Sequence, residues 1–261
     1  MLLGVNIDHI AALREARKIN DPDPLEAVFI AKRAGANQIT LHLREDRRHI
    51  HDDDVLRIRN SSALPLNIEC SINPNILDFI LKISPHRITL VPENRQEVTT
   101  EGGLDVVANF DRITQITRTF REHCIEVSLF IDSQIDQIHA SKEVGAQMIE
   151  LHTGAYANLH LMLNSNLPHT HNAIQSLQIP RSKLKILLED SLVSLHNGAK
   201  EASKLGLEVA AGHGLNYHNL APILQILEIK ELNIGQSIIA RSIFTGLESA
   251  IKEMVALVKS S

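Results

Sequence analysis

Cysteine is scarce in this chain of 261 residues, which has only Cys70 and Cys124. Two thiols cannot supply a disulfide framework, and their scarcity fits a reducing compartment. No stretch approaches the ~18 consecutive apolar residues of a membrane span. The first residues, MLLGVNIDHI, lack the basic group that opens a signal peptide. We therefore expect a cytoplasmic protein without a membrane partner.

An excess of positive charge is also missing. The formal net charge is -5, which argues against general affinity for nucleic acids. The composition is 44% hydrophobic and 22% charged, as in globular proteins with a large core. No linker composition divides the chain, so residues 1–261 are predicted to form one domain.

Short β-branched runs alternate with helical patterns along the chain. Eight strands are predicted, over Leu2–Asp8, Gln38–Leu43, Leu66–Cys70, Arg87–Val91, Glu126–Ile131, Gln147–His152, Glu208–Ala211 and Glu231–Ile234. Eight strand–helix units in a chain of this length predict an α/β fold, a (β/α)8 TIM barrel. A doubly wound open sheet is the alternative, but NIDHIAALREAR after the first strand has no glycine-rich dinucleotide loop.

One segment departs from this alternation. Residues 158–190, after the sixth strand, form a connection of about 30 residues, longer than usual in such folds. We interpret it as an insertion-like elaboration of the barrel with short helices of its own.

Polar and ionisable side chains stand at the predicted C-terminal ends of the strands. They are Asn6, Asp8, His9, His42, Arg44, Glu69, Glu93, Asp132, Glu150, His152, His213 and Asn233. Active sites of (β/α)8 barrels lie at this end. Burying so many ionisable groups costs several kcal/mol unless they are paired or used. The pattern favours a ring-shaped active site over a satisfied structural network.

Some of these residues have a structural alternative. Glu69 lies within the apolar run LPLNIECSI, where a buried ion pair is the alternative to a functional carboxylate. His213 is flanked by glycines in AAGHGL, which suits close approach to a ligand, although a turn histidine is possible. The run HIHDDD is read as a helix start. His169 and His171 have ligand-like spacing without nearby partners, so no metal site is predicted.

Two glycine turns, GHGL after strand seven and NIGQS after strand eight, predict a phosphate site. Arg17, Arg44 and His49 are candidates for a second anionic group. No lysine lies at a predicted strand end, which disfavours Schiff-base chemistry on the enzyme. Strand one offers no His-x-His pair for a metal hydrolase.

The motifs GVNIDHIAALREAR, HLREDRRHI, LVPENRQEVTTEGGLDV, EVGAQMIELHTGAYA, AGHGLNYHN and ELNIGQSIIARSIFTGL together resemble the pyridoxine 5'-phosphate synthase family. The resemblance runs from Leu3 to about Leu257, apart from 158–190. It implies a (β/α)8 barrel assembled as an octamer, a tetramer of dimers. It also implies condensation of 3-amino-2-oxopropyl phosphate with 1-deoxy-D-xylulose 5-phosphate, with no metal or organic cofactor.

The resemblance also implies residue roles. His42 and Glu69 match proton acceptors, His213 a proton donor, and Glu150 a carboxylate that stabilises transition states. Contacts to the deoxyxylulose phosphate are expected from Asp8, His9, Arg44, His49 and Thr99. Contacts to the amino ketone phosphate are expected from Asn6, Arg17, Gly214, Gly235 and Gln236. The family usually has histidine where Gln236 stands.

Two other functions remain open at this point. One is another cofactor-free barrel enzyme of phosphosugar metabolism, such as an isomerase that uses Glu69 as its base. The other is a non-catalytic barrel that binds a phosphorylated metabolite and needs no carboxylate in strand three.

Overall fold

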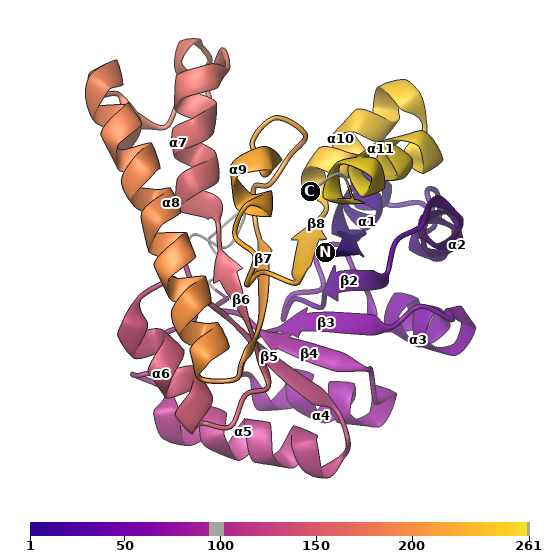
Figure 1. Cartoon of the computed structure of the whole chain (residues 1–261). Coiled ribbons are helices and arrows are strands. Elements are labelled where there is room, and N and C mark those ends of the chain that lie inside the picture. Colours follow the sequence, from indigo (N-terminus) through magenta and orange to yellow (C-terminus); the bar gives the residue numbers. More distant parts are fainter. Residues whose placement is uncertain (94–101, 260–261) are drawn as a thin grey trace.

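The computed structural model describes residues 1–93 and 102–259. Its strands all run parallel and close into a barrel in chain order, so that β1 pairs with both β2 and β8 (Figure 1). The strands are β1 (Leu2–Asn6), β2 (Gln38–His42), β3 (Leu66–Cys70), β4 (Arg87–Leu90), β5 (Glu126–Ile131), β6 (Met148–His152), β7 (Glu208–Gly212) and β8 (Glu231–Ile234). The predicted (β/α)8 fold is confirmed, and an open doubly wound sheet is wrong.

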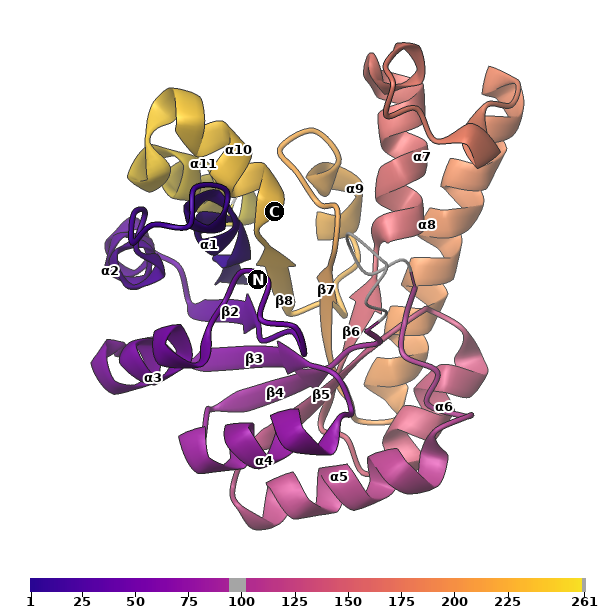
Figure 2. The same ribbon diagram turned by 180° about the vertical axis from the view of Figure 1, so that it is seen from behind.

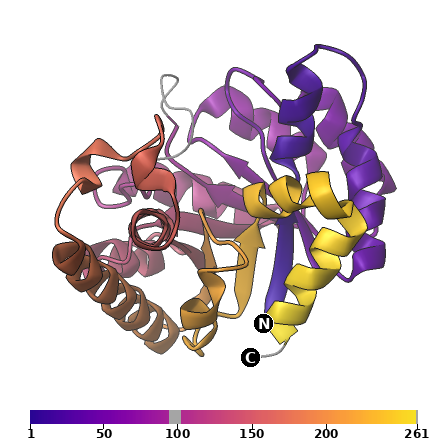
Figure 3. The ribbon, with the colours of Figure 1, turned by 90° about the horizontal axis from the view of Figure 1, so that it is seen from above.

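Helices surround the strands when the molecule is viewed from above (Figure 3). They are α1 (Asp8–Glu15), α2 (Pro24–Ala34), α3 (Asp52–Ser61), α4 (Pro74–Ile83), α5 (Phe110–Glu122), α6 (Ile135–Glu143), α7 (Gly154–Asn164), α8 (Arg181–Lys204), α9 (Leu220–Leu224), α10 (Gln236–Thr245) and α11 (Leu247–Lys259). No helix in the described ranges is long and apolar enough to cross a membrane.

Local signals in the sequence set several of these boundaries. Asp23 caps α2 by accepting a hydrogen bond from the Leu25 N–H at 2.9 Å, and Pro24 occupies the first turn. Gly35 ends the same helix with a φ of 96°, in the left-handed region that glycine adopts without strain. The first strand is shorter than predicted, because α1 already begins at Asp8.

The HIHDDD run starts α3, as predicted, but it is only partly solvated. Asp54 is 4% exposed and binds Arg14 through two oxygens, at 2.7 and 2.8 Å. A buried carboxylate held by a guanidinium in this two-pronged way ties α1 to α3. The sequence could not reveal this pair, whose members lie 40 positions apart.

Residues 158–190 lie in a helical arm that stands beyond the end of β6 (Figures 1 and 2). Two short 3-10 turns, Leu167–His169 and Gln175–Leu177, join α7 to α8. A small apolar cluster of Leu159, Met162, Leu163 and Leu184 holds the two helices together. Short helices were predicted in this segment, but the start of the long helix α8 at Arg181, inside it, was not.

The inside of the barrel is polar. Thr40, Asn67, Thr89 and Ser128 are at most 1% exposed, and Arg87 on β4 reaches across to Glu231 on β8 at 2.7 Å. Apolar residues on the outward strand faces fill the space beneath the helices, as Ile39 and Leu41 do on β2. The polar interior leads to the C-terminal ends of the strands, where the candidate site lies.

Candidate active site

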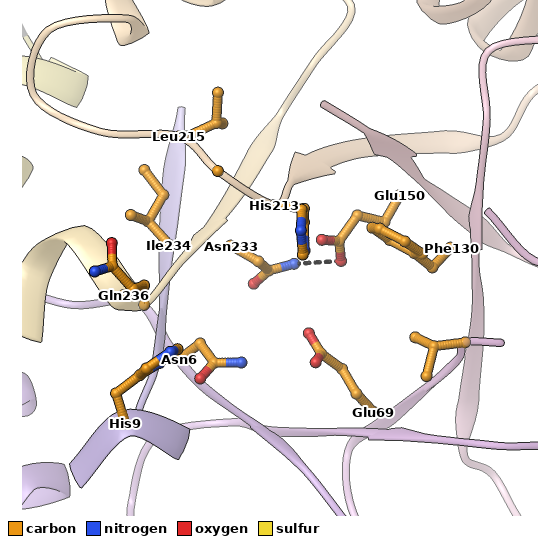
Figure 4. Close-up of a pocket in the computed structure, with 13 residues that line it drawn as sticks. Asn6, His9, Glu69, Phe130, Glu150, His213, Leu215, Asn233, Ile234 and Gln236 are labelled. Carbon is orange, nitrogen blue, oxygen red and sulfur yellow. Dashed lines mark hydrogen bonds between the residues drawn. The ribbon is translucent and has the colours of Figure 1, made fainter. Parts of the chain in front are cut away.

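A cavity of about 240 Å³ opens at the C-terminal ends of the strands (Figure 4). Residues at or just after most of the strand ends line it. They are Asn6, His9, Glu69, Val91, Phe130, Glu150, His213, Gly214, Leu215, Asn233, Ile234, Gly235 and Gln236. The structure therefore brings together many of the residues that the sequence placed at strand ends.

Two carboxylates, Glu69 from β3 and Glu150 from β6, point into this cavity (Figure 4). Enclosure by the barrel raises the pKa of Glu69 well above its usual range, and the charges of Glu150 and Asp8 add to the effect. Burial also raises the pKa of Glu150 to about 8, against the opposing hydrogen bond from Asn233. Two buried carboxylates with raised pKa values can exchange protons near neutral pH.

His213 follows β7 in a strained backbone conformation. Its φ is 78°, and that of Gly214 is 80°. A Cβ atom at residue 214 would lie 2.5 Å from the Ala157 Cβ, so glycine is required there. Strain of this kind in a non-glycine residue is typical of functional sites. Burial lowers the pKa of His213 to about 4, and the neighbouring His152 and His9 add to this.

His42 ends β2 beside a buried carboxylate from the end of β4. Its Nε2 lies 3.6 Å from Glu93 Oε2, and the Arg44 Nε lies 3.6 Å from Glu93 Oε1. Burial would raise the pKa of Glu93, but His42 and Arg44 outweigh it and lower that pKa. Glu93 also accepts the Glu45 N–H at 3.0 Å. The sequence placed Glu93 at a strand end without giving it a role, since its partners come from another strand.

Asp8, at the start of α1, links Asn6 at the end of β1 to His42. Asn6 Nδ2 donates to Asp8 Oδ2 at 3.0 Å, and Asp8 Oδ1 accepts the His42 N–H at 2.8 Å. The His49 ring lies 6.4 Å from that of His42, and burial lowers the pKa of His49. His42, Arg44, Asp8 and His49 therefore form one polar sector beside the cavity.

Some predicted ligand contacts do not line the cavity: Asp8, Arg44 and His49 lie in the sector beside it. Arg17 is exposed beyond the end of α1 and is not among the residues that line the cavity. Thr99 lies outside the described residues, so its predicted contact stays a prediction.

A helix start follows β8, where the glycine turn NIGQS predicts a phosphate site. Helix α10 begins at Gln236, directly after Gly235, and the first N–H groups of a helix attract anions. A Cβ atom at Gly235 would lie 2.9 Å from the Asn6 Cβ and from its backbone oxygen. Glycine is therefore needed here for space, and Gln236 itself is exposed.

A histidine–carboxylate pair lies beside His213 at the cavity. His152 Nδ1 lies 2.9 Å from Asp132 Oδ1, and the His152 ring is 5.2 Å from that of His213. The hydrogen bond with His152 lowers the pKa of Asp132. Both residues were predicted at strand ends, and Asp132 fixes the His152 ring that lies beside the His213 ring.

No group of three or more His, Cys, Asp or Glu side chains is arranged to hold a metal ion within residues 1–93 and 102–259. His169 ends a 3-10 turn of the arm, and His171 is exposed after it. Although their spacing is typical of metal ligands, no third potential ligand lies near them in these parts of the chain.

Carboxylates and histidines gathered at the strand ends of a closed parallel barrel, beside a helix start, are the arrangement of a (β/α)8-barrel enzyme. A family model supports a closer assignment: that of the pyridoxal phosphate biosynthesis protein PdxJ matches residues 3–260. The chain belongs to this family, and the resemblance noted in its motifs is confirmed.

The chain aligns with named relatives over nearly their whole length. The chain is 63% identical to the pyridoxine 5'-phosphate synthase of Wolinella succinogenes, with 98% of each chain covered. It is 58% identical to that of Aliarcobacter butzleri, with 100% of each covered.

Solved structures of low identity share the fold alone. Phosphoribosyl anthranilate isomerase from Thermus thermophilus has a TM-score of 0.55 at 13% identity and covers 100% of this chain and 99% of its own. The tryptophan synthase A-subunit of Pyrococcus furiosus has a TM-score of 0.57 at 12% identity and covers 98% and 97%.

Proposed function

We propose that this protein condenses 3-amino-2-oxopropyl phosphate with 1-deoxy-D-xylulose 5-phosphate to form pyridoxine 5'-phosphate, phosphate and water, a step of vitamin B6 synthesis. The observation that carries the proposal is the carboxylate pair Glu69–Glu150, which shares one cavity with His213 in a chain of the PdxJ family. Relatives named as synthases over their full length support the same reaction.

The side chains fit the proton transfers that this condensation requires. Joining an amine to a ketone, expelling phosphate and losing water each move protons. Glu69 and His42 act as bases and His213 as an acid. Glu150 stabilises the positive charge of imine and enamine intermediates. Because the substrate brings the amine, no lysine of the protein is needed.

His213 needs its substrate in order to act as a proton donor. Its pKa of about 4 leaves the imidazole neutral near pH 7 when the cavity is empty. A bound phosphate dianion favours the charged imidazolium and raises that pKa. Substrate binding and the supply of the proton are thereby coupled.

The two substrates occupy different sectors of the cavity rim. We assign the amino ketone phosphate to the α10 start, with contacts from Asn6, Arg17, Gly214, Gly235 and Gln236. The deoxyxylulose phosphate is assigned to the β2 side, with contacts from Asp8, His9, Arg44, His49 and Thr99. The cluster around His42 and the space at Gly235 support this division.

Purified protein supplied with both substrates tests the proposal. We expect pyridoxine 5'-phosphate by absorbance and an equal amount of released phosphate, with neither product when one substrate is omitted. Conversion of one substrate alone would identify a barrel isomerase instead. Binding of both without turnover would identify a non-catalytic binding protein.

Full activity is expected after exhaustive chelation, because the proposed chemistry uses side-chain acids and bases and needs no metal or organic cofactor. Activity is compared before and after treatment with a strong chelator, with a known zinc hydrolase treated in parallel. Loss of activity that one divalent metal restores would contradict this expectation.

The assembly is proposed to be an octamer, a tetramer of dimers, in the cytoplasm. Large apolar side chains on α10 support association, since Ile243 is 73% and Phe244 is 88% exposed. Light scattering after size exclusion should give a mass of about eight chains of 29.0 kDa. A monomer mass at micromolar concentration would contradict the proposal.

A further inference from the structure

A hydrogen-bonded chain inside the barrel ends on Glu150. Asn233, on β8, donates from Nδ2 to Glu150 Oε2 at 2.8 Å (Figure 4). Its Oδ1 accepts the Thr40 hydroxyl at 2.9 Å and the Gln38 Nε2 at 3.4 Å. Barrel interiors are usually filled by branched apolar residues, so a polar chain that reaches the active site needs a functional explanation.

The chain has a fixed direction because it begins at an arginine, which has only donors. Arg87 Nη1 lies 3.3 Å from Gln38 Oε1 and 2.7 Å from Glu231 Oε1. Gln38 therefore turns its Nε2 toward Glu231, at 3.0 Å, and toward Asn233 Oδ1. Since Oδ1 of Asn233 is used as an acceptor, the amide presents its N–H group to Glu150.

Two glycines leave the space that these side chains fill. A Cβ atom at Gly4 on β1 would lie 2.1 Å from Asn233 Oδ1. A Cβ atom at Gly212 on β7 would lie 2.1 Å from Glu150 Oε1. The two side chains occupy space left open in the neighbouring strands, which restricts both to a narrow range of orientations.

We propose that Asn233 is a positioning residue of the active site, whose amide, oriented by Thr40 and Gln38, holds the Glu150 carboxylate in one orientation and favours its ionised form. The inference rests on the proposed function for the catalytic role of Glu150. An N–H donor stabilises a carboxylate more than a protonated carboxyl group. The hydrogen bond thus opposes the burial that raises the pKa of Glu150 to about 8.

An infrared titration of the full-length protein without substrates tests the inference directly. The carboxyl band of Glu150 is identified by its loss in Glu150→Gln. In Asn233→Leu, which has nearly the same shape but no donor, the midpoint should move to higher pH. A rise of about one unit makes the ionised fraction near pH 7 about tenfold smaller. An unchanged or lower midpoint would overturn the inference.

Kinetics supply the second readout. Asn233→Leu should lower kcat about tenfold near pH 7, with both KM values within about threefold, and the loss should shrink as pH rises toward 9. A loss that is equal at every pH would mean a merely structural role and would overturn the inference. If the wild type lacked synthase activity, the proposed function would fail, while the infrared titration would still decide the role of Asn233.

A matched pair of threonine variants provides the control. Thr40→Val removes the donor to Asn233 Oδ1, whereas Thr89→Val removes a buried hydroxyl that binds Asn67 instead. Both side chains are at most 1% exposed inside the same barrel. Thr40→Val should move the Glu150 midpoint upward, and Thr89→Val should not. Equal effects of the two substitutions would overturn the inference even if Asn233→Leu failed to fold.

Discussion

Replacing Glu69 by glutamine is expected to lower kcat by about 10²-fold or more while leaving both KM values within a few fold, because a positioned general base contributes about that factor. Glutamine keeps the shape of the side chain but cannot accept a proton. Enclosure in the barrel first, and then the charges of Glu150 and Asp8, raise the pKa of Glu69, and a raised pKa makes the ionised carboxylate a stronger base. Steady-state kinetics with each substrate varied in turn provide the measurement.

The fold should survive this substitution. Glu69→Gln keeps the shape of the side chain and removes an ionisable group that burial and two nearby carboxylates disfavour, so thermal unfolding should not occur at a lower temperature. Glu208→Gln is the matched control, because Glu208 is an exposed glutamate at the opposite end of the barrel, where β7 begins. The control should keep turnover within about twofold. Near-wild-type turnover of Glu69→Gln would remove this residue from the mechanism.

The barrel was predictable because its strands carry a repeated local signal. Short β-branched runs and helical patterns alternate in the sequence, and the bounds of β3, β5 and β8 match the prediction. The ring of functional groups was also predictable, since parallel strands in a barrel end on the same side. Glu69 and Glu150 could therefore be placed together from strand positions alone.

Tertiary partners account for what could not be predicted. Nothing in the sequence pairs Glu93 with His42, because His42 ends β2, Glu93 follows β4, and the two meet only in the folded barrel. The orientation of the Asn233 amide likewise depends on Arg87 and Gln38 through contacts across the barrel. Strand ends thus predict which residues reach the site, whereas their hydrogen-bond partners require the folded structure.

The second large effect is expected at Gly235. Gly235→Val should raise the KM for 3-amino-2-oxopropyl phosphate by about 10²-fold or more, because its side chain would enter the space beside Asn6 and block the start of α10. The φ of Gly235 is −129°, which any residue can adopt, so space is the reason for glycine here. A thermal unfolding curve checks that the variant is folded, and the KM for the other substrate reports whether the damage is local.

Gln236→Ala is the matched comparison at the next position. If the phosphate binds the backbone N–H groups at the start of α10, the exposed side chain of Gln236 contributes little. Glutamine and neutral histidine can each donate one hydrogen bond, so a side-chain contact to the phosphate would also be kept with glutamine at this position. The KM for the amino ketone phosphate should change by less than about tenfold, below ~1.4 kcal/mol. A larger effect at Gln236 than at Gly235 would show that a side chain, and not the backbone, binds this phosphate.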